Sequence, residues 1–151
     1  MRKRDIEFII ATTDDVIDLI DVQNKAFLSD YFKYGECPGY GHTQKSMRNL
    51  VDNVIVYKIM VDRAIVGDII VWDKGEGNYF LGCLCVIPEY ENNGLGQTAM
   101  KFLEHEFDDA RHWALETPAE NERNVYFYQK RGFKITKEYM DGSVKIVFLE
   151  K

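Results

Sequence analysis

The sequence predicts an α/β fold with a mixed, largely antiparallel central sheet of about seven strands and about four flanking helices. Strand-like and helix-periodic segments alternate along the chain, and three consecutive strand-like segments are joined by short turns. A later strand leads through a glycine turn into an amphipathic helix, an order typical of crossover connections. With 151 residues, 46% of them hydrophobic, the chain fits one domain over residues 1–151 with a single core.

The first third of the chain predicts one strand and two helices. Residues 6–11 have the composition of a strand, and Thr12 followed by acidic residues gives a helix start. Apolar residues at three- and four-residue steps predict a helix to about Leu28. Residues 29–42 are rich in glycine and aromatic residues, show neither period and are expected to form a structured loop. Thr43 is expected to cap a second short helix.

The rest of the chain alternates strands with two further helices. Because a helical crossover joins the strand before the glycine turn to the next strand, these two are expected to be parallel. The other strand connections predict antiparallel hairpins. The expected strands are 54–61, 64–73, 79–87, 113–117, 133–139 and 144–149, and the expected helices include apolar positions 99, 100, 102, 103 and 107, and residues 121–131.

The composition excludes several classes of function. The formal net charge is −6, whereas broad nucleic-acid binding relies on basic patches, so no nucleic-acid partner is expected. The same charge permits cationic small molecules or basic peptides as partners. Apolar runs reach only a few residues, far short of the roughly 20 that a membrane span needs, so no membrane contact is expected. Arg2, Lys3 and Arg4 lead directly into Asp5 without the apolar core of a signal peptide, which predicts a cytoplasmic protein.

The three cysteines favour free thiols over a disulfide framework. Cys37, Cys83 and Cys85 are odd in number and have apolar or aromatic neighbours. The period of a strand would place Cys83 and Cys85 on one face. No second Cys or His pair at ligand spacing completes a zinc site, so we expect no metal and interpret both as buried small side chains.

An anion site is indicated where the strand ending at Ile87 passes through a glycine turn into a helix. The first backbone N–H groups of a helix lack intrahelical partners, and the helix dipole adds a partial positive charge there. Gly94 and Gly96 have no Cβ, so the chain can turn tightly and a phosphate can approach the amides. On its own this pattern is more often a plain helix-entry turn.

Two motifs in this order resemble the Gcn5-related N-acetyltransferase (GNAT) superfamily. The first is the glycine turn. The second runs from Asn121 to Phe133, where an Asn opens a helix, Tyr128 follows seven residues later and Gly-Phe closes it. The order of elements is similar to the family along essentially the whole chain, although the first third matches by architecture only. The resemblance implies a GNAT-type sheet in which the fourth and fifth strands, residues 79–87 and 113–117, splay apart.

The resemblance further implies that acetyl-CoA, the acyl donor, binds in the gap between the splayed strands. Backbone groups of Leu84, Cys85 and Val86 would bond the pantetheine arm much as an added strand would. Asn121 would hold the arm from the other side. The pyrophosphate is expected on the amides of Asn93, Gly94, Leu95, Gly96, Gln97 and Thr98.

The implied reaction is direct transfer of the acetyl group to an amine of a small molecule or peptide in a ternary complex. Tyr128 would protonate the departing thiolate as general acid, and a backbone N–H of the fourth strand would stabilise the oxyanion. Two simpler interpretations stay open, with Tyr128 as a helix core residue and Asn121 as an N-cap. Both a monomer and a homodimer are compatible with the resemblance.

Three features depart from the family pattern. Glu91 stands where relatives usually have Gln or Arg, so its carboxylate should repel a diphosphate unless it points to solvent. Asn124 replaces the more usual Ala, and the strand from Tyr79 to Val86 contains no acid that could serve as base. These departures motivate an alternative, a catalytically weak or inactive acyl-CoA-binding sensor or partner module. A nucleotide-binding P-loop is disfavoured because no Gly-Lys-Ser/Thr follows the glycine turn.

The loop between the first two helices is where this family builds its acceptor pocket. We therefore expect acceptor-site residues among Tyr31, Tyr34, Glu36, Tyr40 and His42. The tyrosines offer flat amphipathic surfaces, the glutamate a counter-charge for an amine, and the histidine a base with a pKa near neutrality. The alternative is an ordered loop whose aromatic side chains pack on the sheet.

Overall fold

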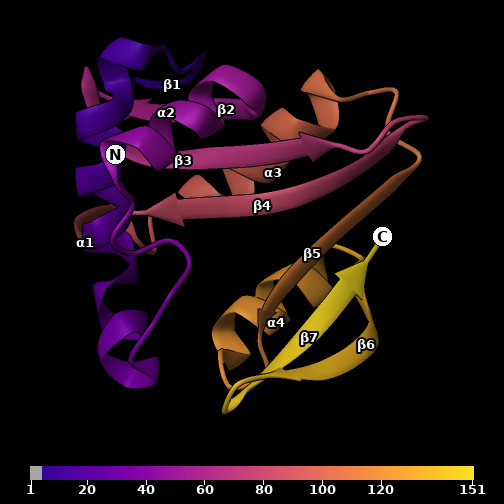
Figure 1. The fold of residues 1–151 in the computed structure, drawn as a ribbon. Coiled ribbons are helices and arrows are strands. Elements are labelled where there is room, and N and C mark those ends of the chain that lie inside the picture. Colours follow the sequence, from indigo (N-terminus) through magenta and orange to yellow (C-terminus); the bar gives the residue numbers. More distant parts are fainter. Residues whose placement is uncertain (1–4) are drawn as a thin grey trace.

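The computed structural model describes residues 5–151, which form one seven-stranded sheet with helices on both faces (Figure 1). The predicted fold class is confirmed, whereas the basic residues 2–4 lie outside the described part of the chain. The strands are β1 (Ile6–Ile10), β2 (Ile55–Val61), β3 (Ala64–Asp73), β4 (Asn78–Val86), β5 (His112–Pro118), β6 (Lys134–Asp141) and β7 (Val144–Glu150). The helices are α1 (Val16–Tyr34), α2 (Gln44–Asn53), α3 (Leu95–Glu106) and α4 (Glu122–Lys130), with short 3-10 turns η1 (Thr13–Asp15) and η2 (Pro88–Tyr90).

The sheet order is β1-β2-β3-β4-β5-β7-β6, and every neighbouring pair is antiparallel except β4 and β5. The parallel pairing predicted from the crossover is therefore confirmed. It covers only three residue pairs, from Asn78 opposite His112 to Phe80 opposite Ala114. Beyond these pairs β5 continues along β7 and diverges from β4 (Figure 1). The two strands thus open a gap in the middle of the sheet.

A bulge in β4 changes the facing of its second half. Leu81 pairs with Val71 and Cys83 pairs with Ile70, so Gly82 is the extra residue. A Cβ on Gly82 would lie 2.7 Å from the indole nitrogen of Trp72, which is too close for any other residue without a shift. After the bulge, Cys83 and Cys85 both face the side of the sheet that α1 covers.

Helix α1 is longer than the sequence pattern predicts. It continues past Leu28 to Tyr34 and ends at Gly35, which adopts the left-handed conformation with φ 78° and donates its N–H to the carbonyl of Tyr31. Exposed aromatic side chains such as Phe32 end the apolar stripe but do not stop a helix, whereas a left-handed glycine does. Even at this length, no helix within residues 5–151 is long and apolar enough to cross a membrane.

Two clusters of buried side chains pack against the sheet. One lies under α1 and α2 and includes Leu19, Met47 and Ile70. The larger cluster includes Ile69 of β3 and Leu103 of α3. Each fully buried side chain of this kind contributes about 1.5–3 kcal/mol by removing apolar surface from water. This packing therefore holds the elements that border the gap between β4 and β5.

Candidate active site

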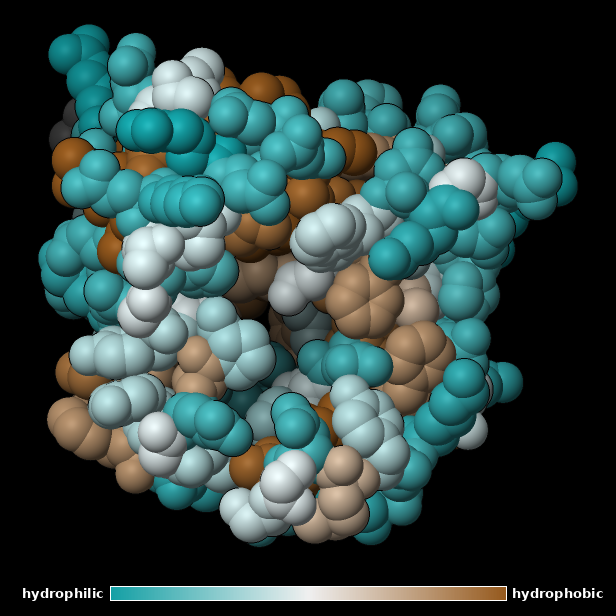
Figure 2. All heavy atoms as spheres, in the orientation of Figure 1, coloured by the Kyte–Doolittle hydropathy of each residue, from teal (hydrophilic) through white to brown (hydrophobic). Residues whose placement is uncertain are grey.

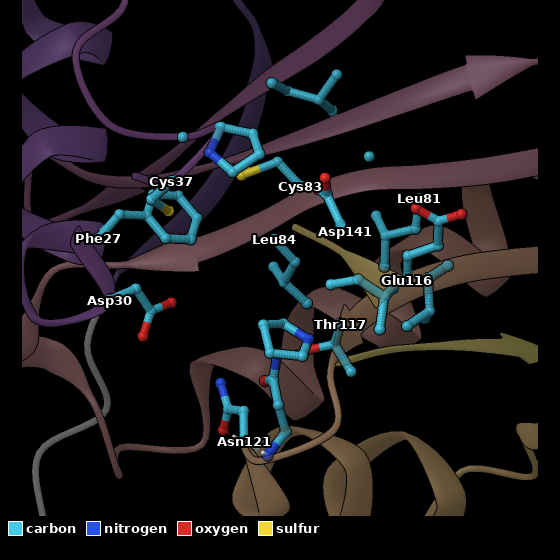
Figure 3. A pocket seen from close by; sticks show the side chains of 18 of the residues that line it. Phe27, Asp30, Cys37, Leu81, Cys83, Leu84, Glu116, Thr117, Asn121 and Asp141 are labelled. Atoms are coloured by element: carbon cyan, nitrogen blue, oxygen red, sulfur yellow. Dashed lines mark hydrogen bonds between the residues drawn. The ribbon is translucent and has the colours of Figure 1, made fainter. Parts of the chain in front are cut away.

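A cavity of about 760 Å³ opens where β4 and β5 diverge. In Figure 2 it is the hollow near the middle of the face shown. Its walls are residues 81–84 of β4, residues 115–118 of β5, the end of α1 with the segment after it, α4, and the β6–β7 hairpin. Figure 3 shows how side chains from these separate elements meet around the cavity.

Tyr128 lies in the wall that α4 contributes, with 5% of its surface exposed. Its ring packs edge-on against Phe127 and Phe133, at centroid distances of 5.0 and 5.6 Å. Burial, and then the nearby Cys83, raise the pKa of its hydroxyl well above the ordinary value, while Arg131 opposes the shift. The hydroxyl therefore keeps its proton at neutral pH. The ring belongs to the core as the simpler interpretation held, and the same residue borders the cavity.

Asn121 also borders the cavity and caps α4. Its side-chain oxygen accepts a hydrogen bond from the backbone N–H of Asn124 at 3.2 Å, which confirms the N-cap interpretation. Asn124 in turn donates from its side-chain amide to the hydroxyl of Thr117 on β5, at 3.2 Å. Asn124 thus connects α4 to β5, one of the two strands that border the gap.

The glycine turn enters α3 with two residues in the left-handed conformation. Asn92 has φ 65°, and Gly94, the N-cap of α3, has φ 76°. Within the described chain, the amides of residues 93–97 donate to no carbonyl or side chain, as expected before the first helical hydrogen bond. Thr98 differs from the expectation, because its backbone N–H and its hydroxyl both donate to the carbonyl of Gly94 at 3.0 Å. Five of the six predicted amides therefore remain available to an anion.

Gly96 serves the packing of α3 against α4. A Cβ at this position would lie 3.1 Å from the ring tip of Phe127. The guanidinium of Arg131 stacks on the same ring, 3.8 Å from its centroid. The N-terminus of α3 and the α4 wall of the cavity are therefore in direct contact.

The negative charge of Glu91 beside the glycine turn is balanced by a nearby arginine. Its carboxylate lies 3.7 Å from the guanidinium of Arg123 on α4, and Arg123 also donates a hydrogen bond to the side-chain oxygen of Asn92. All of these side chains are accessible to solvent. Arg123 therefore offsets the repulsion that Glu91 alone would exert on a bound diphosphate.

Asp68 on β3 is a buried acid that the sequence patterns did not single out. It is 0% exposed, and its carboxylate accepts hydrogen bonds from the Gln23 amide at 2.8 Å and from the thiols of Cys83 and Cys85 at 3.4 and 3.3 Å. Burial raises the pKa of Asp68 to about 6, although these three donors act in the opposite direction. The sequence did contain one indication of this buried acid, because Asp68 lies within the otherwise apolar strand that begins at Ala64.

The two thiols therefore do more than fill apolar space. Their predicted position on one strand face is confirmed, and both donate to Asp68. The donor atoms of Asp68, Cys83 and Cys85 lie within 4.8 Å of one another, a spacing that a metal ion could bridge. The thiol hydrogens satisfy the carboxylate without an ion, and the absence of a metal stays a prediction.

The structure brings together three of the five predicted acceptor-site residues. Tyr34, Glu36 and His42 border the cavity, whereas Tyr31 and Tyr40 stack on each other with centroids 4.3 Å apart and do not. Burial lowers the pKa of His42, whose Nδ1 lies 2.9 Å from the hydroxyl of Ser46. His42 is therefore neutral at pH 7 and able to accept a proton.

The predicted cofactor residues of β4 have different surroundings. Leu84 borders the cavity, while the side chain of Cys85 faces Asp68 and Val86 pairs with Gly67. Three further carboxylates of the cavity wall, those of Asp30, Glu116 and Asp141, escaped the sequence patterns because they come from α1, β5 and β6.

Comparison with known proteins agrees with this geometry. The model of the acetyltransferase (GNAT) family matches residues 21–133. The chain belongs to this family. The protein YrkN of Bacillus subtilis (strain 168) is a relative with 32% identity over 113 residues, which are 70% of this chain and 60% of YrkN. The chain thus spans about 60% of the length of this relative.

Solved structures show the same GNAT fold. The PaiA N-acetyltransferase of Thermoplasma acidophilum, in complex with coenzyme A, has a TM-score of 0.79 at 20% identity, covering 95% of this chain and 98% of that one. The ribosomal-protein-S18-alanine N-acetyltransferase of Escherichia coli has a TM-score of 0.76 at 16% identity, covering 98% and 92%. The predicted family resemblance is confirmed.

Asp68 should make the stability of this GNAT protein depend on pH. Its pKa of about 6 in the folded state lies above the ordinary value, so between about pH 4 and 6 the folded chain holds a proton that the unfolded chain has lost. The free energy of unfolding should therefore fall as pH rises through this window, by on the order of 3 kcal/mol, and stay level above it. Urea denaturation at pH 4, 5, 6 and 7 measures this fall.

The Asp68→Asn variant should lose that pH dependence, because Asn has no proton to exchange. The exposed Asp18→Asn on α1 is the matched control and should retain it. Parallel pH curves for wild type and Asp68→Asn would contradict the assignment.

Proposed function

We propose that this GNAT protein transfers an acetyl group from acetyl-CoA to an amine of a small molecule or peptide. The observation that carries the proposal is the β4–β5 pair, which opens after Phe80 and Ala114 into a cavity that the buried Tyr128 borders. The PaiA structure, whose fold this chain shares, contains coenzyme A. We further propose that residues 1–151 act as one catalytic domain.

In this proposal the pantetheine arm lies along β4. The strand has no β5 partner after Phe80, so backbone groups of Leu84, Cys85 and Val86 can bond the arm as a neighbouring strand would. Asn121 faces the same cavity from α4. The free amides of residues 93–97, at the positive end of the α3 dipole, then bind the pyrophosphate.

The reaction needs a nucleophile, an acid and a base. The neutral amine attacks the thioester carbonyl, a β4 backbone N–H stabilises the oxyanion, and the carbon–sulfur bond breaks. Tyr128 gives its proton to the departing thiolate; its raised pKa keeps the hydroxyl protonated at neutral pH until that step. We assign removal of the amine proton to His42, which is neutral and borders the cavity, because β4 supplies no acid.

A CoA-binding module without catalysis remains the alternative. The lack of an acid on β4 favours it, and the position of Tyr128 in the cavity wall opposes it. Release of free thiol from acetyl-CoA, measured across a broad panel of amines, separates the two functions. Background release throughout, together with measurable CoA binding, would select the module.

Acetyl-CoA should stabilise the folded chain. Ligand at about 100 times its dissociation constant adds roughly 2.7 kcal/mol to the free energy of unfolding. For a chain of this size the melting temperature should rise by about 5–10 °C. Differential scanning fluorimetry with acetyl-CoA, and with sodium acetate as control, measures the shift. An unchanged melting temperature at millimolar acetyl-CoA would refute the cofactor assignment.

Replacing Tyr128 by Phe should lower kcat by about 10²–10⁴-fold, the usual contribution of a positioned acid. The dissociation constant for acetyl-CoA should change by less than about twofold, because the ring and its packing are retained. Steady-state kinetics and calorimetry measure the two quantities. Tyr126→Phe is the matched control, since Tyr126 lies on the same helix with 65% of its surface exposed. Equal kcat in the Tyr128 and Tyr126 variants would remove Tyr128 from the mechanism.

Glu91→Gln should tighten the binding of acetyl-CoA by about two- to fivefold, by removing a like charge beside the diphosphate and freeing Arg123. The gain should shrink in high salt. The control is Glu104→Gln, about 15 Å along α3 from the turn. Weaker binding by the Glu91 variant would show that the carboxylate supports the turn instead of opposing the ligand.

A further inference from the structure

Four carboxylates border the cavity, and none of its lining residues within the described chain is a Lys or Arg. The carboxylates are those of Asp30, Glu36, Glu116 and Asp141. From their arrangement, and from a buried amide oxygen of Gln23 that lacks a partner, we propose that the acetyl acceptor is a linear aliphatic polyamine. This inference rests on the proposed function and names the acceptor class of the same site.

The carboxylates lie on opposite walls. Asp30 and Glu36 come from the end of α1 and the segment after it, whereas Glu116 lies on β5 and Asp141 at the end of β6. In Figure 3 Asp30 lies on one side of the cavity and Glu116 and Asp141 on the other, with Cys83 between them. A ligand with positive charges at separate positions along its length matches this distribution.

These carboxylates have no cationic partner of their own within residues 5–151. None of them takes part in an ion pair. Lys33 is near Asp30 but pairs with Glu120 at 3.5 Å, and Glu116 accepts only the hydroxyl of Tyr139, at 2.8 Å. Burial raises the pKa of Asp30, which indicates that its charge is incompletely solvated. A bound ammonium group would supply the missing compensation for Asp30, whereas the carboxylates of Glu36, Glu116 and Asp141 are exposed to solvent.

Gln23 provides an independent observation. It is 1% exposed and borders the cavity, and its Oε1 has no hydrogen-bond partner among the described residues. Its Nε2 donates to the carboxylate of Asp68 at 2.8 Å and lies 3.8 Å from the sulfur of Cys83. Exchanging the two ends of the amide would set an oxygen against the Asp68 carboxylate, so the orientation is fixed. Oε1 is therefore an unsatisfied hydrogen-bond acceptor, and the N–H of an amine could donate to it.

A polyamine can use all of these features at once. One amino group is neutral, attacks the acetyl carbon of the thioester and passes its surplus proton to His42. The carbon–sulfur bond breaks, and CoA leaves as a thiol after its thiolate takes the proton of Tyr128. The remaining amino groups stay charged and pair with the carboxylates on either wall. Phe27, Trp72 and Leu81 border the same cavity and offer apolar surface to the methylene chain.

Other acceptors fit less well. An amino acid carries a carboxylate, which the four acidic side chains would repel with no lining cation to receive it. A simple monoamine leaves most of the carboxylates unpaired. The four carboxylates also border a single cavity of about 760 Å³. This size is typical of sites for small molecules and favours a small acceptor over a peptide.

The test compares spermidine, n-butylamine and a lysine-rich peptide as acceptors for the full chain with acetyl-CoA. We expect kcat/KM to be at least about tenfold higher for spermidine than for either other acceptor, and to fall as ionic strength rises. Calorimetry with the CoA complex should show that spermidine binds at least about tenfold more tightly than butylamine. Equal or better use of butylamine or of the peptide overturns the polyamine assignment and leaves the acetyltransferase function standing.

The binding measurement separates the two proposals. Spermidine that binds the CoA complex without acetyl transfer would refute the proposed function but support the polyamine site. Spermidine that neither binds nor reacts refutes the polyamine site, whatever other amine is acetylated.

Variants on each wall locate the charges. Asp30→Asn should lower kcat/KM for spermidine by about tenfold, as expected for the loss of a half-buried ion pair, and Asp141→Asn, at an exposed carboxylate, by about two- to fivefold. Each variant should change kcat/KM for butylamine by less than about twofold. Asp18→Asn, an exposed acid on α1 outside the cavity, makes the same change in charge and should leave both acceptors unaffected. Equal losses for spermidine and butylamine would show a general structural defect and overturn the assignment of these carboxylates to the ligand.

Discussion

The short parallel pairing of β4 with β5 is the constraint on which the rest of the structure depends. Three residue pairs hold the strands together at one end, and the Gly82 bulge and the antiparallel partner β7 direct their other ends apart. Backbone groups in the middle of a sheet are normally paired. An opening there leaves strand edges unpaired, and in the proposed complex the pantetheine arm pairs with the free edge of β4. Helices α1 and α4 then place side chains at the opening.

The buried Asp68 connects the core to this opening. A carboxyl group without exposure is costly unless donors surround it, and here the donors are Gln23 and two thiols on the neighbouring strand. Since Gln23 has to direct its nitrogen at Asp68, its oxygen is left without a partner among the described residues, in a side chain that borders the cavity. An interaction deep in the sheet thus leaves an unpaired acceptor beside the cavity. The cysteines, which sequence patterns treat as small apolar residues, belong to the same arrangement.

Sequence was sufficient for features with local causes. The strands, the crossover, the N-caps at Thr43 and Asn121 and the tight turn at Gly94 all follow from periodicity or from the chemistry of a few adjacent residues. The predicted end of α1 was wrong because an apolar stripe indicates only which residues are buried. The helix itself ends where the backbone leaves the helical conformation, at the left-handed Gly35. Asp68 and the carboxylates of the cavity could not be grouped from sequence, since β3, β5, β6 and α1 meet only in the folded chain. The free end of α3 was predictable, but assigning Thr98 required knowing where the first helical hydrogen bond begins.

The distribution of charge also explains how an acidic chain could bind a polyanionic cofactor. With a net charge of −6, it has no excess of basic side chains, and in the proposed complex the pyrophosphate would bind amides at the N-terminus of α3, with Arg123 engaged by Glu91. Those dipoles are fixed by the fold and act over a short range. Four acidic side chains instead border the cavity itself, where in the proposed complex they would favour a cation. In the proposed complex the negatively charged diphosphate and the positively charged acceptor would therefore meet different groups of the protein. Their own opposite charges would then favour the ternary complex that direct transfer requires.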